Sequence, residues 1–331
     1  MTGVSRAWSA LQELPGVRRA WPASDGSLTV EVVRDASLLA GRLSADGGLR
    51  LAGHRRDPRL PGLTTSGGRL VVHRLHKRAV VLHPDRASKA LRPGRAAGVA
   101  AVSSRMRAAC RRAGLGAAAV RTVAEDRLEF ELLPGRTLHD LGDDGLDGWR
   151  ELAARWPLLA RQPVDLPAHD AAAEVAVLRQ WLGHAELFGS LPRMAELARA
   201  VDTTCAGLAG APEPAVTLHR DLHDKQALWD GRSLALLDLD TAARGEAALD
   251  LANLLTHIDL RHAQGSLREP GPVREALAGV IEELRISPAR LAAYEAAARL
   301  RLAFVYSFRP SAGRWLDAWV DRDLTHAPLR A

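Results

Sequence analysis

The stretches HRDLHDKQ at residues 219–226 and LLDLD at residues 236–240 decide the fold and the chemistry that this sequence predicts. The apolar run Val216–Leu218 precedes the first stretch, and a second apolar run ends at Asp238. Short apolar runs between polar segments are typical of strands. We therefore expect the first stretch in a loop between two strands and Asp238 at the end of a strand, where their carboxylates could converge.

Carboxylates that converge from a loop and a strand end are what phosphoryl transfer needs from a protein. One carboxylate orients and deprotonates the attacking hydroxyl, and other oxygen ligands hold Mg²⁺ on the phosphates. The catalytic loop of protein kinases reads H-R-D-x-x-x-x-N. Here the first three letters match, Gln226 replaces the final Asn, and Asp238 follows Asp221 by seventeen residues. This spacing indicates a kinase.

Three consecutive segments, residues 219–226, 237–240 and 245–252, resemble the motifs of the aminoglycoside phosphotransferase and choline kinase-like family. That family usually shows H-G-D-x-H-x-x-N, then I-D-[FW]-[DE], then G-D-P-x-x-D-L-A, and residues 131–138 resemble its linker. The resemblance extends over Leu70–Ile258. It implies a bilobal, protein kinase-like α+β fold with a β-rich N-lobe and a mainly helical C-lobe. Protein kinases match less well, because His223 stands where they have Lys.

The resemblance also implies roles for the residues of these motifs, with ATP and Mg²⁺ as cofactors and a small-molecule hydroxyl as the acceptor. Asp221 would be the catalytic base and His219 would brace the catalytic loop. Asp238 would be a metal ligand, with Gln226 as the second. Asp250 would hold the loop through backbone hydrogen bonds.

On the nucleotide side, the resemblance implies that Lys89 contacts the α- and β-phosphates. Glu131 and Leu133 would meet adenine through backbone groups, and the turn that contains Lys77 would cover the phosphates. The sequence departs from the kinase pattern at one point, because it has no acidic residue between Arg86 and Ala124. Kinases normally hold the phosphate-binding lysine with a glutamate on a helix.

The order of expected elements agrees with a bilobal plan. Residues 1–65 are expected to begin the sheet of the N-lobe, residues 66–133 to form the nucleotide-binding N-lobe with the hinge, and residues 134–331 to form the helical C-lobe. Pro93-Gly94 is expected to open a helix with an apolar stripe. Ser287 followed by proline predicts the start of a late helix. The main helices are expected near residues 146–160, 172–187, 192–208, 248–258, 273–284 and 288–305.

Composition excludes several classes of protein. Apolar residues make up 47% of the 331 residues, enough for a core. No stretch approaches the ~18 uncharged apolar residues of a membrane span, and residues 1–16 have no apolar signal-peptide core. The two cysteines, Cys110 and Cys205, form no disulfide framework. A soluble cytoplasmic protein is expected.

Charge is distributed unevenly along the chain. Residues 1–133 carry 23 basic and 11 acidic side chains, or +12, and residues 134–331 carry 22 basic and 28 acidic ones, or −6. A basic half can bind nucleic acid, but aromatic residues make up only 4% of the chain, which disfavours stacking on single strands. The acidic second half favours a cationic acceptor, such as an aminoglycoside, choline or an amino sugar.

Two alternatives to an active kinase remain at this point. Gln226 and the missing helix glutamate also suit a catalytically silent nucleotide- or small-molecule-binding protein on the same fold. His219 and His223, with the neighbouring aspartates, could instead form a hydrolytic metal site. That reading is disfavoured, because a zinc helix needs its histidines on a regular helix. Asp224 and Lys225 are expected at the surface of the loop.

Overall fold

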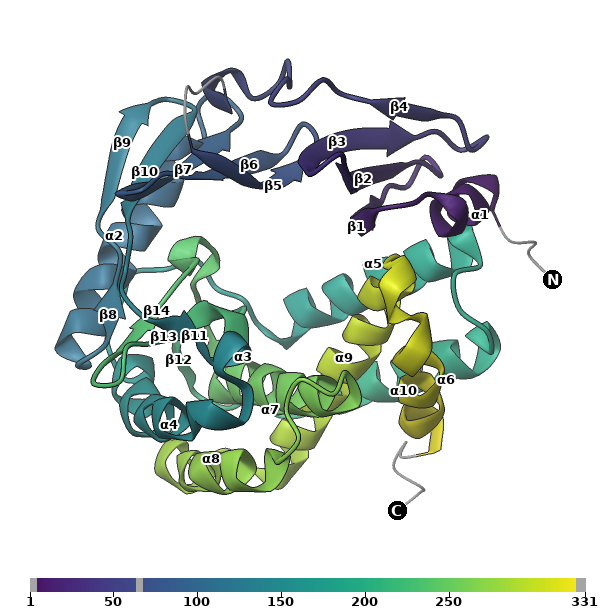
Figure 1. The fold of residues 1–331 in the computed structure, drawn as a ribbon. Helices are drawn as coiled ribbons and strands as arrows, with labels where there is room; N and C mark the ends of the chain where they lie inside the picture. Colours follow the sequence, from purple (N-terminus) through teal and green to yellow (C-terminus); the bar gives the residue numbers. More distant parts are fainter. Residues whose placement is uncertain (1–4, 64–67, 326–331) are drawn as a thin grey trace.

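The computed structural model describes residues 5–63 and 68–325, and side chains up to residue 322. The chain folds into a β-rich N-terminal part and a mainly helical C-terminal part, as the sequence predicts (Figure 1). No helix in these ranges is long and apolar enough to cross a bilayer. The structure therefore has the bilobal α+β architecture of a protein kinase-like fold.

The N-terminal segment forms a small unit of its own. Helix α1 (Arg6–Glu13) precedes four antiparallel strands in the order β1-β2-β3-β4. The strands are β1 (Val17–Pro22), β2 (Leu28–Arg34), β3 (Ser37–Leu43) and β4 (Leu49–Leu51). The expectation that residues 1–65 begin the N-lobe sheet is thereby corrected, because these strands pair only with one another.

The apolar face of this first sheet explains the difference. Its buried side chains pack on Phe188 and Phe308 of the helical lobe, whose rings meet edge to face at 5.4 Å. The indole of Trp8 in α1 donates to the carbonyl of Ser307 at 3.3 Å. Burial against the helices, rather than strand pairing with the next sheet, thus holds the segment in place.

The second sheet contains five antiparallel strands in the order β5-β6-β7-β10-β9. They are β5 (Arg69–Arg74), β6 (Arg78–Leu82), β7 (Arg86–Leu91), β10 (Arg127–Glu131) and β9 (Val120–Ala124). Helix α2 (Ala96–Arg112) lies between β7 and β9 in the chain. Its predicted stripe is confirmed, since Met106 and Cys110 are fully buried and the stripe valines are partly buried.

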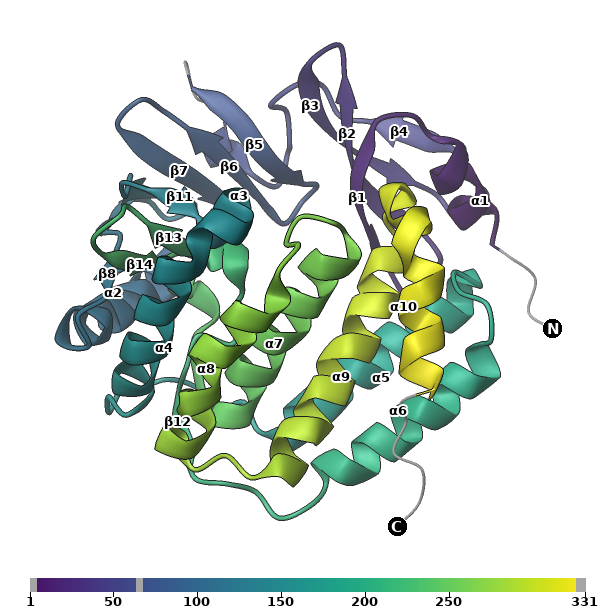
Figure 2. The ribbon, with the colours of Figure 1, turned by 60° about the horizontal axis from the view of Figure 1, so that its bottom comes forward.

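The helical lobe surrounds the catalytic loop. Its helices are α3 (Leu138–Leu141), α4 (Leu146–Ala160), α5 (Ala171–Phe188), α6 (Met194–Leu208), α7 (Ala247–Ala263), α8 (Pro270–Leu284), α9 (Pro288–Ser307) and α10 (Gly313–Thr325). Helices α7 and α9 pack together under the sheets (Figure 2). The predicted start of α9 is confirmed, because the Ser287 hydroxyl accepts from the Arg290 N–H at 3.3 Å.

Two small sheets carry the loop and tie the lobes together. Strands β12 (Ala215–Leu218) and β15 (Ala243–Glu246) form an antiparallel pair. The other sheet has the order β11-β13-β14-β8, where β14 and β8 are parallel. Because β8 directly follows α2, this pairing fixes α2 to the helical lobe. The strands are β11 (Arg136–Thr137), β13 (Ala227–Trp229), β14 (Leu234–Leu236) and β8 (Gly116–Ala117).

Candidate active site

His219 fixes the start of the catalytic loop from inside the lobe. It follows β12, is fully buried, and its Nε2 lies 2.8 Å from the carbonyl oxygen of Leu237. Its backbone N–H donates to Asp250 at 2.7 Å. Its Nδ1 accepts from the Asp221 N–H at 3.4 Å. His219 therefore joins the loop to the segment that carries Asp238, and it acts as a positioning residue rather than one that touches substrate.

Asp250 holds the same loop from the first turn of α7. Its carboxylate accepts the N–H groups of His219 and Arg220, at 2.7 and 2.8 Å. Burial raises the pKa of Asp250 to about 6, although these bonds favour its charged form. Arg220 has φ 71°, a left-handed conformation that glycine adopts more readily. The two bonds to Asp250 stabilise this turn, which aims Asp221 outward.

Asp221 is the exposed member of the loop. Its side chain is 49% accessible, and it faces a cavity that Gln226 and Asp238 also line. Asn253 of α7 supports the loop behind it, because its amide donates to the carbonyl of Leu222 at 2.8 Å. A carboxylate that is open to solvent and held by a rigid backbone can accept a proton from a bound hydroxyl.

Asp224 is buried, and the expectation of a surface residue is wrong. It is 2% exposed and binds Arg261 of α7 in two places, Nε to Oδ2 at 2.6 Å and Nη2 to Oδ1 at 3.0 Å. His139 lies 2.9 Å from the same carboxylate. Burial alone would raise the pKa of Asp224, but these hydrogen bonds and the guanidinium hold it well below its usual range. The pair fixes the second half of the loop onto α7.

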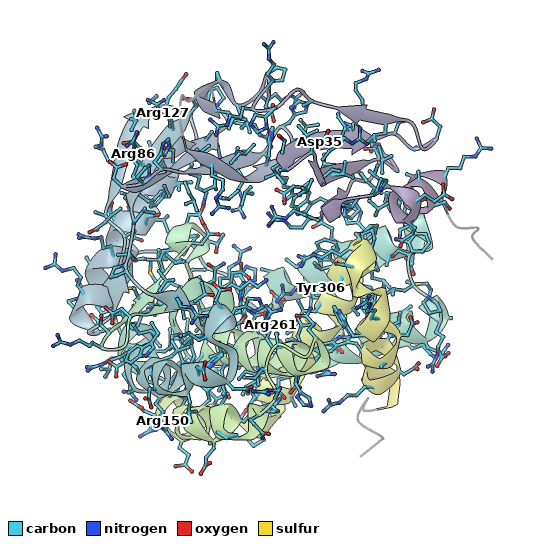
Figure 3. The ribbon with its side chains drawn as sticks, in the orientation of Figure 1. Asp35, Arg86, Arg127, Arg150, Arg261 and Tyr306 are labelled. Carbon is cyan, nitrogen blue, oxygen red and sulfur yellow. The ribbon has the colours of Figure 1, made fainter. Side chains whose placement is uncertain are left out.

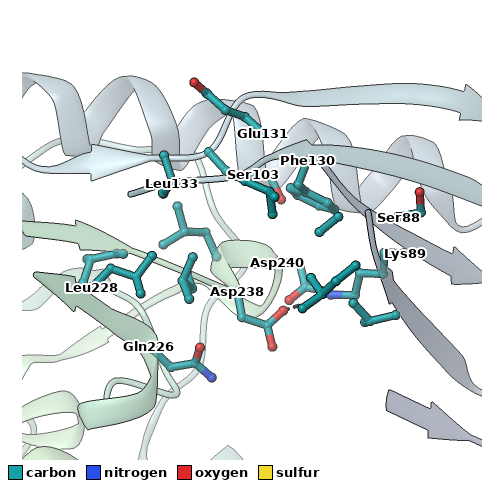
Figure 4. Close-up of a pocket in the computed structure, with 18 of the residues that line it drawn as sticks. Ser88, Lys89, Ser103, Phe130, Glu131, Leu133, Gln226, Leu228, Asp238 and Asp240 are labelled. Carbon is teal, nitrogen blue, oxygen red and sulfur yellow. Dashed lines mark hydrogen bonds and ion pairs between the residues drawn. The ribbon is translucent and has the colours of Figure 1, made fainter. Parts of the chain in front are cut away.

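Lys89 finds acidic partners that its own neighbourhood in the sequence lacks. Its ammonium group lies 2.9 Å from Oδ1 of Asp238 and 2.6 Å from Oδ2 of Asp240 (Figure 4). Lys89 lies on β7 and is 6% exposed. The two aspartates follow β14, so Lys89 is held by carboxylates of the helical lobe and not by the helix glutamate that is usual in kinases.

The same aspartates offer oxygen ligands for a divalent cation. Burial alone would raise the pKa of Asp238, but Lys89 and Arg78 hold it far below its usual range. Burial and the neighbouring Asp238 raise the pKa of Asp240, and its Oδ1 is buried without a hydrogen-bond partner. Gln226 lines the same cavity. Mg²⁺ prefers oxygen ligands. It therefore fits these two carboxylates, one of which has an unsatisfied buried oxygen, beside the amide oxygen of Gln226.

A cavity of about 410 Å³ extends from this group between the lobes. Its walls are mainly apolar, with Phe130 on one side and Leu133 near the hinge. The Glu131 carboxylate turns away from Asp238 in Figure 4 and accepts the Ala119 N–H at 3.1 Å, so only its backbone can meet a ligand. Flat apolar walls with hinge backbone groups at the rim suit a nucleotide base.

Lys77 does not reach this cavity. It is exposed at the turn between β5 and β6, and neither interlobe cavity includes it in its lining. Arg78, the next residue, lines both cavities, and its guanidinium lies 3.7 Å from Asp238. The structure therefore brings Arg78, and not Lys77, to the cavities, because the first residue of β6 points inward and the turn points outward.

A second cavity of about 480 Å³ adjoins the first. The two share Val72, Arg78, Gln226 and Asp238, and Asp221 lines only the second of them. A ligand in each cavity would thus meet at the wall formed by Gln226 and Asp238. This is the arrangement that a transfer reaction between two bound molecules requires.

Comparison with known proteins agrees with this architecture. No protein-family model matches the sequence, and no curated protein does. Among solved structures, an aminoglycoside phosphotransferase mutant in complex with AMP-PNP and hygromycin B has a TM-score of 0.55 at 15% identity, covering 78% of this chain and 94% of its own. A choline/ethanolamine kinase family protein from Mesorhizobium loti has a TM-score of 0.53 at 15% identity, covering 81% and 92%. An amicoumacin kinase in complex with AMP-PNP and Ca²⁺ has a TM-score of 0.56 at 12% identity, covering 78% and 89%.

The chain has the fold of these small-molecule kinases. They are the proteins whose motifs the sequence resembles.

The hydrogen bonds of the loop argue against the hydrolytic metal site. Both ring nitrogens of His219 are hydrogen-bonded, one to the carbonyl of Leu237 and the other to the Asp221 N–H. His223, Asp224 and His257 do lie close together, but the two imidazoles are stacked at 4.4 Å and 16°. Asp224 already binds Arg261 through both oxygens. Burial holds the pKa of His257 well below its usual range, and its ring packs on that of His223 beside the ion pair of Asp224 and Arg261.

Proposed function

We propose that the protein is an ATP- and Mg²⁺-dependent phosphotransferase that moves the γ-phosphoryl group to a hydroxyl of a small molecule. One observation carries the proposal: two interlobe cavities adjoin at Gln226 and Asp238, and Asp221 opens into the second. The first cavity would hold the nucleotide and the second the acceptor. Residues 68–133 would supply most of the nucleotide side, and the helical lobe would supply the catalytic loop.

The nucleotide would be held by its base and its phosphates. The adenine would lie against Phe130 and Leu133 and meet the backbone from Glu131 onward. Lys89 would contact the α- and β-phosphates. Asp238 and Gln226 would hold Mg²⁺, with Asp240 beside them. The cation would neutralise charge on the phosphates, while Lys89 would be released from part of its contact with the aspartates.

The chemical step would centre on Asp221. Its carboxylate would accept the proton of the acceptor hydroxyl, the hydroxyl oxygen would form a bond to the γ-phosphorus, and the bond from that phosphorus to the bridging oxygen would break. The products are a phosphate ester and ADP, and the proton stays on Asp221 until solvent removes it. The accessible side chain on a fixed backbone supports this role.

The solved structures support the choice of cofactor and of acceptor class. One was determined with AMP-PNP and hygromycin B, and another with AMP-PNP and Ca²⁺. Both proteins are named as enzymes that phosphorylate small molecules. Because the identity to this chain is 15% or less, the comparison supports a reaction class and not an acceptor.

Two variants test the proposal. Asp221→Asn should leave nucleotide binding nearly unchanged and abolish ADP release, and Asp238→Ala should remove the Mg²⁺ dependence of nucleotide binding. Asp147→Asn, in an exposed ion pair on α4, is the matched control. Thermal-shift titrations with ATP, with and without Mg²⁺, would be followed by ADP release over a panel of sugars, amino alcohols and aminoglycosides. Strong residual turnover in Asp221→Asn refutes the role of Asp221. Nucleotide binding that ignores Mg²⁺ favours the catalytically silent alternative.

A further inference from the structure

The second cavity is lined mainly by cations, and we refer to it as the basic cavity. Its only carboxylates are Asp221 and Asp238. Figure 3 labels Arg261 and Tyr306 where the helical lobe faces the sheets. The lining cations come from both sheets and from the helical lobe: Arg18, Arg19, Arg74, Arg78, Lys225, Arg261, Arg301 and Arg309.

Several of these cations already have partners. Arg19 binds Glu31 of β2 at 2.8 Å, and Arg261 binds Asp224. Arg301 donates to Asn253 at 2.8 Å. These contacts compensate part of the positive charge of the cavity wall, and they need no bound ligand to explain them.

Three cations have no carboxylate partner among the described residues. Within the described ranges, no carboxylate oxygen lies within 4.0 Å of a charged nitrogen of Arg74, Lys225 or Arg309. The guanidinium of Arg74 lies over the ring of Trp21, 5.1 Å from its centre. The guanidinium of Arg309 lies over the ring of Tyr306, 4.1 Å from its centre. Nε of Arg74 is buried and makes no hydrogen bond.

The three cations also repel their neighbours. Burial first, and then nearby Arg78, lowers the pKa of Arg74. Burial and then Arg261 lower the pKa of Lys225. Burial lowers the pKa of Arg309, as do nearby Arg19 and Arg261, against the raising effect of Tyr306. Charges that face one another across a cavity, such as the half-buried Arg74 and Arg309, destabilise the protein unless something of opposite sign binds there.

The nucleotide does not account for these charges. Of the eight cations, only Arg78 lines both the first cavity and the basic cavity. The other seven line the basic cavity and not the first, and Arg301 also lines a smaller cavity with Asp221 and Glu174. Arg18 and Arg19 lie on β1, and Arg309 begins the turn before α10. They surround the position in front of Asp221 where, on the proposed function, the acceptor would bind.

We propose that the acceptor is an anionic hydroxyl compound, and that Arg74, Lys225 and Arg309 bind its phosphate or carboxylate group in the basic cavity. That the bound anion is the acceptor rests on the proposed function. That an anion binds in the basic cavity does not depend on it. Guanidinium groups bind phosphate and carboxylate oxygens through paired N–H donors, and a dianionic phosphate monoester matches three unpaired cations best. A phosphorylated sugar or polyol is therefore the favoured class.

The first sheet gains a role from this assignment. Strand β1 supplies Arg18, Arg19 and Trp21 to the basic cavity, and Glu31 of β2 accepts the backbone N–H of His73 in β5 at 2.7 Å. The sheet thus closes one side of the acceptor cavity and is fixed to the nucleotide-side sheet at that point. It would be a specificity element of the acceptor site.

The test measures binding without turnover. Isothermal titration calorimetry with the full chain would compare glucose 6-phosphate and glucuronate with glucose and glucosamine, which share the pyranose ring, and with inorganic phosphate as the minimal anion. Each titration would be repeated with AMP-PNP and Mg²⁺ at saturation. We expect the anionic probes to bind at least roughly tenfold more tightly than glucose or glucosamine, both with and without AMP-PNP.

Arg74→Gln and Arg309→Gln should each weaken binding of the anionic probes by roughly 10- to 100-fold. Arg150→Gln, on the exposed face of α4, should change nothing. The melting temperatures of the two cavity variants should equal or exceed that of the wild type, because each removes an uncompensated charge. A large fall in both would show that these arginines stabilise the fold instead, and would overturn the proposal.

Three further outcomes overturn the anion site. Glucosamine or glucose could bind as tightly as the phosphorylated sugar, or no anionic probe could bind with a Kd below about 1 mM. AMP-PNP could also displace every anion, which would assign the arginines to the nucleotide phosphates. None of these results bears on Mg²⁺-dependent ADP release, so the phosphotransferase proposal stands or falls separately.

Discussion

Replacing Asp224 by asparagine would remove one charge from a buried ion pair behind the catalytic loop. Asp224 and Arg261 are 2% and 4% exposed, and they form two hydrogen bonds of 2.6 and 3.0 Å. Asparagine keeps the shape and one acceptor oxygen, but it leaves the guanidinium uncompensated. Breaking a buried pair from one side costs about 3–5 kcal/mol. Because domains are typically stable by only about 5–15 kcal/mol, the loss is a large fraction of the total.

The expected change can be measured as a melting temperature. With an unfolding entropy of about 2.1 cal/mol/K per residue, each kcal/mol lowers the melting temperature of a chain of 331 residues by about 1.4 °C, so Asp224→Asn should melt roughly 4–7 °C below the wild type at pH 7.5. Far-UV circular dichroism at 222 nm follows the helical lobe. The control Asp147→Asn breaks an exposed pair in which both side chains are more than half accessible, and it should shift melting by no more than about 2 °C.

The double variant Asp224→Asn/Arg261→Met separates the pair from its surroundings. Removing both charges leaves no unpaired cation, so the double variant should lose about 0.5–3 kcal/mol less than the sum of the two single variants. The reasoning is refuted if Asp224→Asn melts within the range of the Asp147→Asn control. It is also refuted if the two single variants add without coupling.

Three further predictions concern the loop and its nucleotide-side partner. Lys89→Met should raise the Kd of Mg²⁺-ATP by roughly 10- to 100-fold in a fluorescence titration, because the phosphates lose a charged donor, and an unchanged Kd would remove Lys89 from the site. Arg220→Gly should raise the free energy of unfolding by up to about 1 kcal/mol, since glycine adopts the left-handed φ of 71° at this position without strain. A lower melting temperature would show that the contacts of the arginine side chain outweigh the relief of strain. In the folded protein, hydrogen bonds lower the pKa values of Asp57 and Asp224 against the raising effect of burial. The stability that these two carboxylates contribute is therefore fully present above their unfolded pKa of about 4, and it is lost as the pH falls through and below that value. Urea midpoints between pH 3 and pH 7 should therefore fall on the acid side, and a flat profile would contradict those shifts.

The features that the sequence predicts well are those with local causes. The cap of α9 requires only a serine followed by proline, and the strands β2 and β3 require only apolar runs bounded by turn residues. The loop at residues 219–226 is also predictable, because its four charged residues and its flanking strands are adjacent in the chain. Local patterns of this kind specify the elements and the catalytic segment.

The features that the sequence does not predict depend on distant partners. Asp224 looks like a surface residue until Arg261, on another element, reaches it. Lys89 has no acidic neighbour in its own region, and its two aspartate partners lie about 150 residues away. The separate first sheet depends on Phe188 and Phe308, which belong to helices formed much later in the chain. No periodicity or spacing near these residues signals such contacts.

The basic cavity shows why net charge is a poor guide to an acceptor. The second half of the chain carries −6, which favours a cationic ligand, yet it contributes Lys225, Arg261, Arg301 and Arg309 to the cavity wall. Charges farther away than the Debye length of about 8 Å are largely screened, so a ligand responds to the groups that surround it and not to the sum over a lobe. The lobe's acidic side chains are spread elsewhere or paired, as Asp224 is. Cations from both lobes therefore face Asp221 across the basic cavity, and an anionic acceptor is the ligand that they would retain there.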